Sequence, residues 1–380
     1  MFKERGNRAL HFLDRYAGIP LIALGRLRHK RPFPSKIATI GLLRSVAIGD
    51  TVLISAIIAD LRMAFPRTQL IFFAGPGNYE MACLLEGVDR VVKVPIRDVV
   101  AGVRAVRSAA VDVMIDFGSW ARLEALLILL SKSAFTIGFR TAGQHRHYGY
   151  DLVVDHSSCV HELENYRRLA RALGVNCQNA PRVPVAAAQS QEALREYAVF
   201  HPWPGGKRKE LKQWPSEKWV RLIEELARVG MNVVLTGAPE DREGNDGLIA
   251  QLSQETQAQT RSAAGASLRE TAVTLLGARL VVSVNTGVMH LAAALGTPLV
   301  ALHGPTSSKR WGPICKRATV IDSPAQGCGY LNLGWEYPSR PPECMKCIPY
   351  ERVRDACFEV LRQAPVSRHL ETRIANKTNA

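Results

Sequence analysis

The chain has 380 residues and a formal net charge of +15, with 47% hydrophobic and 22% charged residues. This composition excludes a largely disordered chain, and the length predicts two or three globular domains. The positive charge favours anionic partners, namely nucleic acid, a membrane surface or phosphorylated substrates. Eight cysteines in a chain of this length are too few for a disulfide scaffold, which indicates a protein of the reducing cytoplasm.

The first 35 residues form a basic leader with one short apolar run. This run, from Ala17 to Leu24, contains Pro20 and is too short to span a bilayer. The basic residues that follow it are Arg26, Arg28, His29, Lys30 and Arg31. Two interpretations stay open. The leader either lies at the inner face of the cytoplasmic membrane, with its basic side chains on anionic lipid, or packs on the surface of a domain.

Buried-strand and helix patterns alternate over residues 36–178, which predicts an N-terminal Rossmann-like domain. The expected strands are residues 36–44, 69–74, 90–95, 111–118, 134–139 and 150–154. The expected helices are residues 50–65, 81–86, 99–108, 120–133 and 161–174. Asp50 stands in the N-cap position of the first of these helices, and Gly174 ends the last.

A polar, proline-containing stretch at residues 179–187 interrupts this pattern and predicts a linker. Residues 188–365 then predict a second, C-terminal Rossmann-like domain, followed by a polar tail at residues 366–380. Its expected strands are residues 197–202, 231–237, 279–284 and 298–304, and its expected helices are residues 215–230, 266–277, 287–296 and 350–364.

Alternation of this kind predicts an α/β fold with two doubly wound domains that face a central cleft. Each domain consists of a parallel sheet with helices on both faces. Ligands bind such sheets beyond the carboxyl ends of the strands. Four turns that connect a strand to a helix are therefore candidate site segments.

Three of these turns each carry one charged candidate. Asp50 follows Gly49 at the start of a helix, where it is either a site residue or a simple helix cap. Lys212 follows the glycines at 205–206, where it suits a phosphate; the alternative is a solvated basic loop. Glu240 follows the strand at 231–237, where a carboxylate can bind ribose hydroxyls; the alternative is a solvated turn.

The fourth turn gathers the most hydrogen-bond donors. It connects a strand to a helix whose dipole and exposed backbone N–H groups favour an anion. We expect the end of the next strand, at residues 304–306, to converge on the same place. The candidate residues of the two strand ends are Asn285, Thr286, Gly287, His290, Gly304 and Thr306. Thr286, Gly287 and His290, together with Lys212, predict a site for a diphosphate. Asn285, Gly304 and Thr306 are candidates to contact the sugar or nucleotide attached to it.

Four segments resemble the motifs of the family-nine glycosyltransferases, the lipopolysaccharide heptosyltransferases and their relatives. In chain order they are LLRSVAIGDTVLISAIIADLRMAFP, KQWPSEKW, VVLTGAPEDRE and VNTGVMHLAAALGTPLVALHGPT, and the resemblance covers residues 36–364. It implies a GT-B fold, with the acceptor bound by the N-terminal domain and the nucleotide-sugar by the C-terminal domain. It also implies inverting, metal-independent transfer of a sugar without a cofactor, from ADP-heptose to lipopolysaccharide core or a related surface glycan.

The resemblance implies roles for individual residues as well. Asp50 matches the family's general base, and Lys212 matches its diphosphate-binding lysine. Thr286, Gly287 and His290 match its phosphate-binding turn. One position departs from the pattern, because the family commonly has Asp where this chain has Asn285. That Asp is thought to contact the donor sugar, so the identity of the donor stays open.

Four cysteines gather in the last quarter of the chain. They are Cys328, Cys344, Cys347 and Cys357. Cys344 and Cys347 have the spacing of metal ligands, and Cys328 could join them in a zinc site or a cluster. No second close pair follows, so we expect unpaired buried thiols instead.

Two other functions fit parts of the sequence. A sugar-nucleotide epimerase would have the same fold but would need no acceptor. A nucleic-acid-binding protein would explain the positive charge, and it should gather basic residues and stacking aromatics on one face. Basic residues are instead spread along the chain and aromatic residues make up 7%, so the sequence predicts a glycosyltransferase and no nucleic-acid partner.

Overall fold

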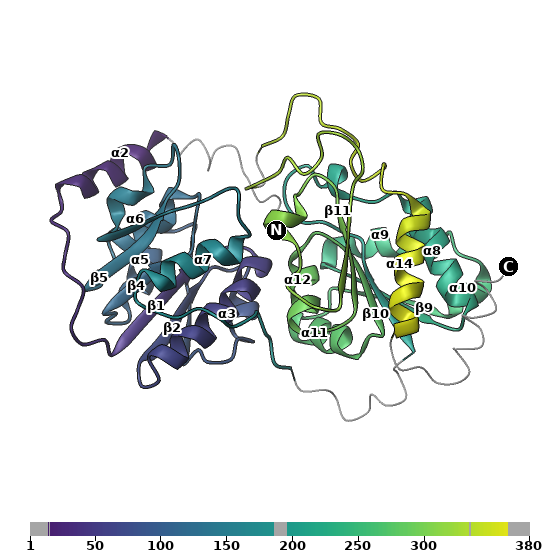
Figure 1. Ribbon diagram of the computed structural model, residues 1–380, viewed down its shortest axis with the longest axis horizontal. Coiled ribbons are helices and arrows are strands. Elements are labelled where there is room, and N and C mark those ends of the chain that lie inside the picture. The colour runs from purple at the N-terminus through teal and green to yellow at the C-terminus, as the bar shows by residue number, and fades with distance from the viewer. Residues whose placement is uncertain (1–13, 15, 186–195, 334–335, 364–380) are drawn as a thin grey trace. The chain divides into compact units, whose positions relative to one another are not determined.

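The computed structural model describes residue 14 and residues 16–185, 196–333 and 336–363. The chain divides into two compact units, Met1–Pro184 and Val185–Ala380, and each is an α/β unit (Figure 1). Three predicted features lie outside the described residues. They are the part of the basic leader before residue 16, apart from residue 14, the start of the second domain at residue 188, and the polar tail at residues 366–380. The predicted α/β class, with one parallel sheet in each unit, is confirmed.

The sheet of the first unit has the strand order β3-β2-β1-β4-β5-β6, and all neighbouring strands are parallel. The strands are β1 (Thr39–Arg44), β2 (Gln69–Ala74), β3 (Arg90–Lys93), β4 (Val113–Asp116), β5 (Phe135–Arg140) and β6 (Leu152–Asp155). These are the six strands that the sequence predicts. Their apolar runs suit a sheet that is covered on both faces, and Leu42 and Phe72 are fully buried.

Helices surround this sheet. They are α2 (Gly18–Ala23), α3 (Ile48–Ala64), α4 (Tyr79–Ala82), α5 (Val99–Arg107), α6 (Arg122–Leu129) and α7 (Glu162–Arg171), with the short 3-10 helices η1 (Leu24–Leu27) and η2 (Arg146–Gly149). Side chains of α2, α5 and α6 form one core with Leu43, Phe73 and Met114 of the sheet. Helix α3 packs against α7.

The sheet of the second unit has the order β12-β11-β10-β7-β8-β9 and is also parallel. The strands are β7 (Tyr197–His201), β8 (Asn232–Gly237), β9 (Thr260–Ala264), β10 (Leu280–Val284), β11 (Leu299–His303) and β12 (Ala318–Asp322). The sequence analysis missed the two edge strands, β9 and β12, because they have only short apolar stretches.

The helices of the second unit cover this sheet in the same manner. They are α8 (Ser216–Arg228), α9 (Arg242–Ile249), α10 (Gln254–Ala258), α11 (Leu268–Gly277), α12 (Gly287–Ala294), α13 (Ser308–Trp311) and α14 (Tyr350–Gln363), with the short helices η4 (Lys209–Lys212) and η5 (Pro239–Asp241). The sequence analysis missed α9 and α10, whose sequences are mostly polar. Trp214 and Trp219 lie in the core of this unit and pack edge to face, with ring centroids 5.0 Å apart.

Each sheet has one point at which the chain reverses its direction of travel across the strands. In the first unit the chain runs from β1 to the edge at β3 and resumes at β4, beside β1. In the second unit it runs from β7 to the edge at β9 and resumes at β10, beside β7. Turns that follow such neighbouring central strands diverge and leave room for a ligand. The fold therefore favours the turns after β1, β4, β7 and β10 as site segments.

The cysteines differ from the expectation. Cys328 and Cys344 form a disulfide, so they are not unpaired thiols, and in this state they are not available for zinc. The thiol of Cys347 is exposed, and of these four cysteines Cys357 alone is both free and buried as expected. Spacing alone could not identify the pair, because the two cysteines are 16 positions apart in the sequence and only the folded chain brings them together.

The described part of the leader packs on the first unit. Ile22 of α2 is fully buried in its core, and the guanidinium groups of Arg28 and Arg31 both form ion pairs with the buried carboxylate of Asp151. Asp151 also accepts a hydrogen bond from the Thr136 hydroxyl, at 2.8 Å. Of the two interpretations left open for the leader, packing on a domain therefore describes Arg28 and Arg31, because the Asp151 carboxylate binds both.

These contacts predict how stability depends on pH. Hydrogen bonds from Arg31, Arg28 and Thr136 outweigh the effect of burial and lower the pKa of Asp151 to about 2. A lowered folded-state pKa stabilises the fold above the unfolded-state value, and this contribution disappears as the pH falls from about 4 to about 2. We expect Asp151→Asn to lower the free energy of unfolding by about 1–2 kcal/mol at pH 7, and by progressively less below pH 4, in urea titrations.

Asp155→Asn is the matched control. Asp155 pairs with Arg140 at 3.2 Å, but 76% of its side chain is exposed. An exposed ion pair of this kind stabilises proteins little, so the control should change the unfolding free energy by less than about 0.5 kcal/mol. Equal stability of Asp151→Asn and the wild type at pH 7 would show that Asp151 does not anchor the leader.

Candidate functional site

Asp50 lies on the first turn of α3, immediately beyond the carboxyl end of β1, with 7% of its surface exposed. The helix begins at Ile48, and the N-cap residue is Ala47. The prediction that Asp50 caps the helix is therefore wrong. The helix starts earlier than the sequence pattern indicates, so the carboxylate lies within the first turn and binds side chains of other elements.

The turn before Asp50 is held in an unusual conformation. Ala47 has a φ of 72°, a value at which a non-glycine residue costs on the order of 1–3 kcal/mol. Ser45, two residues before Ala47, is buried and donates from both its backbone N–H and its hydroxyl to Glu124, at 2.8 and 2.7 Å. These two hydrogen bonds fix the turn from the direction of α6, and so fix the start of α3.

Two side chains bind the carboxylate of Asp50. The Arg44 guanidinium donates to Oδ1 at 2.8 Å, and the Tyr166 hydroxyl donates to the same oxygen at 2.5 Å. Arg44 is the last residue of β1, and Tyr166 comes from α7. The sequence analysis missed both. Arg44 lies inside the first motif and could have been found there, whereas no sequence signal connects Tyr166 with Asp50.

A buried network continues from this carboxylate across the edge of the sheet. Arg44 also approaches Glu124 at 3.6 Å. Arg146 pairs at 2.7 Å with Asp116, the last residue of β4. The Asp116 carboxylate accepts a further hydrogen bond from Tyr150. Burial raises the pKa of Asp116 to about 6, although Arg146 opposes the shift. The two guanidinium groups counter the charge of the acidic groups, which would otherwise be costly to bury.

In the second unit, Lys212 ends the short helix η4, in the segment that follows β7. Its ammonium group donates to the carbonyl oxygen of Gly205 at 2.6 Å, and Gly206 has a φ of 86°, which glycine adopts readily. The lysine thus lies over the two-glycine loop that the sequence analysis singled out.

The turn after β10 has the expected strand-to-helix structure. Thr286 is the N-cap of α12, and its hydroxyl accepts a hydrogen bond from the Met289 N–H at 3.3 Å. Gly287 is the first residue of the helix. His290 lies on its first turn and is buried, with 5% of its surface exposed. The helix N-terminus and its side chains are therefore arranged around one turn at the centre of the sheet, and β10 is the neighbour of β7, the strand that precedes the Lys212 segment.

Asn285 connects this turn to the neighbouring strand. Its side-chain nitrogen lies 3.1 Å from Nδ1 of His303, the last residue of β11, and donates to the carbonyl oxygen of Trp311 at 3.1 Å. An aspartate at this position could not donate to that carbonyl. The departure from the family pattern is therefore matched by the local hydrogen bonding.

The residues after β11 are held by the disulfide-containing loop. Gly304 packs against Cys344 and Met345, and a Cβ atom at this glycine would lie 2.4 Å from the Met345 sulfur. Thr306 forms an isolated bridge with Leu331 of the loop. Both candidates thus follow the strand next to β10, as expected.

Glu240 is exposed on η5, after β8. It therefore follows the strand on the other side of β7. His201, at the end of β7, was not selected from the sequence. It is buried, and burial lowers its pKa to about 4, so it is neutral near pH 7. Its Nδ1 atom lies 3.0 Å from the Thr236 hydroxyl, which identifies it as a packing residue below the turns.

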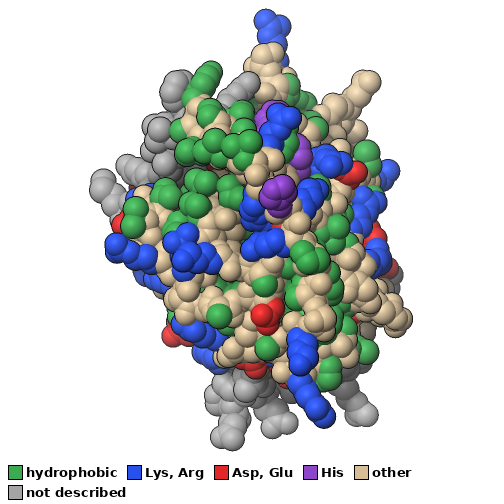
Figure 2. All heavy atoms as spheres, turned by 90° about the vertical axis from the view of Figure 1, so that its left-hand side faces the viewer, with side chains coloured by type: hydrophobic (Ala, Val, Ile, Leu, Met, Phe, Trp, Pro, Cys, Tyr) green, Lys and Arg blue, Asp and Glu red, His purple; other side chains and the backbone are tan. Residues whose placement is uncertain are grey.

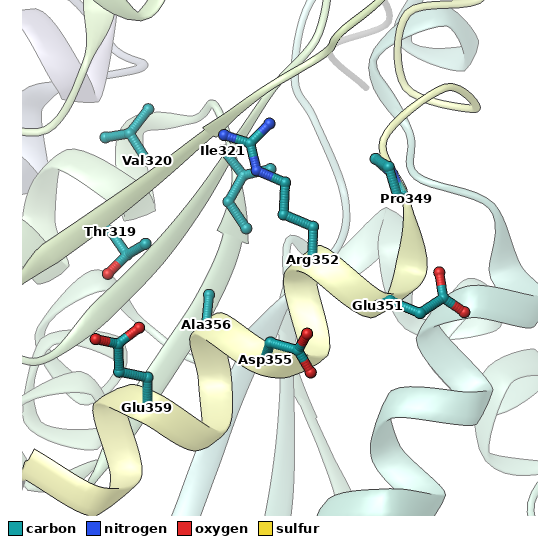
Figure 3. Close-up of a pocket in the computed structure, with 9 residues that line it drawn as sticks. All are labelled: Thr319, Val320, Ile321, Pro349, Glu351, Arg352, Asp355, Ala356 and Glu359. Atoms are coloured by element: carbon teal, nitrogen blue, oxygen red, sulfur yellow. The ribbon is translucent and has the colours of Figure 1, made fainter.

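A surface pocket lies away from these turns, between the edge strand β12 and helix α14 (Figure 3). Thr319, Ile321 and Arg352 line it, and none of the candidate residues does. We therefore place the site at the strand ends and not in this pocket. Among the described residues, no group of three or more His, Cys, Asp and Glu side chains is arranged to hold a metal ion.

Two parallel, doubly wound units with polar turns at their central strand ends correspond to the GT-B class of glycosyltransferases. The model of glycosyltransferase family 9 (heptosyltransferase) matches residues 99–330, and the chain belongs to this family. This confirms the family resemblance, and three of the four sequence motifs lie within the matched range. The matched range includes Tyr166, Lys212 and the turn after β10, whereas Asp50 precedes it.

Individual relatives agree with this assignment. Lipopolysaccharide heptosyltransferase 2 of Salmonella typhimurium is 40% identical over 119 residues, a match that covers 31% of this chain and 34% of the relative. The chain thus spans about a third of that relative's length. Lipopolysaccharide heptosyltransferase 1 of the same organism is 27% identical over 313 residues, which are 77% of this chain and 96% of the relative.

Solved structures confirm the fold. An E. coli ADP-heptose lipopolysaccharide heptosyltransferase II superposes with a TM-score of 0.71 at 22% identity, covering 86% of this chain and 99% of that one. The E. coli heptosyltransferase WaaC with ADP superposes with a TM-score of 0.68 at 23% identity, covering 85% and 99%. At these identities the likeness concerns the fold alone.

Proposed function

We propose that the protein is an inverting, metal-independent glycosyltransferase that moves a heptose from ADP-heptose to a lipopolysaccharide core or related surface-glycan acceptor. The main support is the arrangement at the central strand ends of a family-9 chain. A buried carboxylate, Asp50, follows β1, an anion-suited turn follows β10, and the segment after β7, the strand next to β10, carries Lys212. Relatives named as heptosyltransferases, and a solved relative that holds ADP, support the donor class.

In the proposed reaction Asp50 accepts the proton of an acceptor hydroxyl as that oxygen bonds to the anomeric carbon of the donor sugar. The bond between the anomeric carbon and the diphosphate oxygen breaks, and its electron pair leaves with ADP. Attack from the side opposite the leaving group inverts the configuration. The ammonium group of Lys212, the N-terminus of α12 and the donors of Thr286 and His290 stabilise the departing diphosphate.

Asn285 favours an alternative donor sugar within the same reaction. Its side-chain nitrogen is engaged by His303 and the Trp311 carbonyl, so it offers the donor a neutral amide instead of a carboxylate. A sugar other than heptose is the second candidate. Screening ADP-, UDP- and GDP-sugars for nucleotide release would identify the donor.

The proposed diphosphate site predicts the effect of Lys212→Ala. Loss of a charge-assisted hydrogen bond should weaken ADP binding by roughly 1.5–3 kcal/mol, measured by titration calorimetry. Lys207→Ala is the matched control, because Lys207 is an exposed lysine of the same loop. Unchanged ADP affinity in Lys212→Ala, or an equal loss in both variants, would remove Lys212 from the site.

The general-base role predicts that Asp50→Asn loses ~100-fold or more in kcat while its affinity for ADP is kept. The structure also predicts a lower melting temperature for this variant, since the amide no longer balances the charge of Arg44 at 2.8 Å. Rates are therefore compared below the melting range. A kcat near that of the wild type would contradict the base. The assay contains EDTA, so activity that required added magnesium would contradict metal independence.

We further propose that the leader touches an anionic membrane surface. The leader surface consists of exposed apolar residues on and beside α2 and η1: Tyr16, Leu21, Leu24 and Leu27. Leu27 is the most exposed, at 83%. Burial lowers the pKa of His147, and the nearby basic residues Arg140, His145, Lys30 and Arg26 lower it further. Figure 2 shows hydrophobic side chains next to Lys, Arg and His on this face.

An amphipathic surface of this composition suits the interface of a membrane that contains anionic lipid. In the described part of the chain, no helix has the length and hydrophobicity that a membrane span needs. Contact through the leader surface would bring the enzyme to a lipid-linked acceptor. The packing of Ile22 and the ion pairs of Asp151 would remain undisturbed, because those groups face the unit.

Leu24→Ser/Leu27→Ser should bind vesicles of phosphatidylglycerol and phosphatidylethanolamine at least about ten-fold more weakly than the wild type, because two apolar side chains no longer enter the interface. Sedimentation with vesicles measures this binding. Val99→Ser/Val100→Ser, which alters two exposed apolar residues of α5, is the control and should bind normally. Equal binding by all three proteins would contradict the membrane surface.

A further inference from the structure

Asp50 is held on one side only. All of its hydrogen bonds go to Oδ1, from Arg44 on β1 and Tyr166 on α7. The other oxygen, Oδ2, accepts none from the described residues, and 9% of the side chain is exposed to solvent. A carboxylate bound in this way has one anchored oxygen and one oxygen that is available to a substrate hydroxyl.

The two partners of Oδ1 are not equivalent. The charge of Arg44 is shared, because its guanidinium also lies 3.6 Å from Glu124. Tyr166 is fully buried, and its hydroxyl makes its hydrogen bond to Asp50. Burial, followed by the charge of Asp50, raises the pKa of Tyr166 well above its ordinary value, so the hydroxyl keeps its proton and remains a donor. Tyr166 is thus the neutral donor dedicated to this carboxylate.

The position of Tyr166 is itself fixed. Its ring packs edge to face on Phe117, with centroids 5.3 Å apart, and lies 6.5 Å from the ring of Phe139. Phe117 follows β4, the strand beside β1, so the ring is anchored on the same sheet edge that carries Asp50. A hydroxyl at the end of a locked ring can set the rotation of a carboxylate more firmly than a flexible side chain can.

From this geometry we propose that Tyr166 is a positioning residue for the reaction: by donating to Oδ1 it fixes the Asp50 carboxylate so that Oδ2 receives the proton of the acceptor hydroxyl. The inference rests on the proposed role of Asp50 as the base. Tyr166 itself exchanges no proton. The charged groups that face this pair are Arg44 from β1, Glu124 from α6 and Glu162 from α7.

Tyr166→Phe tests the proposal, because it removes only the hydroxyl and leaves the ring packing in place. We expect kcat to fall on the order of ten-fold, with little change in KM for the donor. Hydrogen bonds to a carboxylate favour its charged form. The acidic limb of the pH–kcat profile should therefore move to higher pH.

Tyr150→Phe is the matched control. Tyr150 is also a buried tyrosine of the first unit, and its hydroxyl donates to another buried carboxylate, that of Asp116, at 2.6 Å. The control should lose stability to a similar degree but leave the acidic limb in place. An unchanged limb in Tyr166→Phe, or a fall in kcat that only follows the loss of stability as in Tyr150→Phe, would overturn the positioning role.

A readout that needs no activity separates this inference from the proposed function. Carbon-13 NMR of labelled aspartate carboxyls, with the Asp50 signal identified by its loss in Asp50→Asn, follows the titration of Asp50 directly. The inference expects this titration to move to higher pH in Tyr166→Phe. No movement would overturn it even if the enzyme transfers heptose. If the Asp50 signal moves in Tyr166→Phe but the wild-type protein transfers no sugar, the proposed function is overturned, and the positioning role with it.

Discussion

The pairing of parallel strands is the constraint on which the rest of the structure depends. Parallel order places every carboxyl end at one edge of each sheet, and the reversal beside β1 or β7 separates the turns that follow the central strands. Residues far apart in the sequence, such as Arg44 and Asp116 in one unit or His201 and Val284 in the other, therefore lie at a common edge. Helix starts supply backbone donors at the same edge.

The carboxyl ends of the two sheets differ in their electrostatics. The first unit buries the carboxylates of Asp50, Glu124 and Asp116 beside two guanidinium groups, Arg44 and Arg146, and every pair carries additional hydrogen bonds. The second unit presents an ammonium group and a helix N-terminus, with no carboxylate among the candidate residues at its central turns. A base that takes a proton suits the first environment, and a diphosphate that departs with negative charge suits the second.

Sequence patterns predicted the strands with clear apolar runs and missed those with short ones. All six strands of the first sheet were found, its edge strands β3 and β6 included, whereas the edge strands β9 and β12 of the second sheet were missed because their apolar stretches are short. The start of α3 was misplaced because Ala47 adopts a positive φ, which no propensity of alanine indicates. The Cys328–Cys344 pair and the contact between Tyr166 and Asp50 depend on tertiary packing, so no local pattern could reveal them.

The misplaced helix start changes the chemistry that Asp50 can perform. As an N-cap, the carboxylate would accept hydrogen bonds from helix N–H groups, and its role would be structural. Asp50 instead lies within the first turn of α3, where those amides are not its partners. The side chains of Arg44 and Tyr166 bind one of its oxygens. The positive φ of Ala47 sets this helix start, and the hydrogen bonds from Ser45 to Glu124 stabilise it. The buried network of α6 thus determines, through one turn, where the candidate base lies.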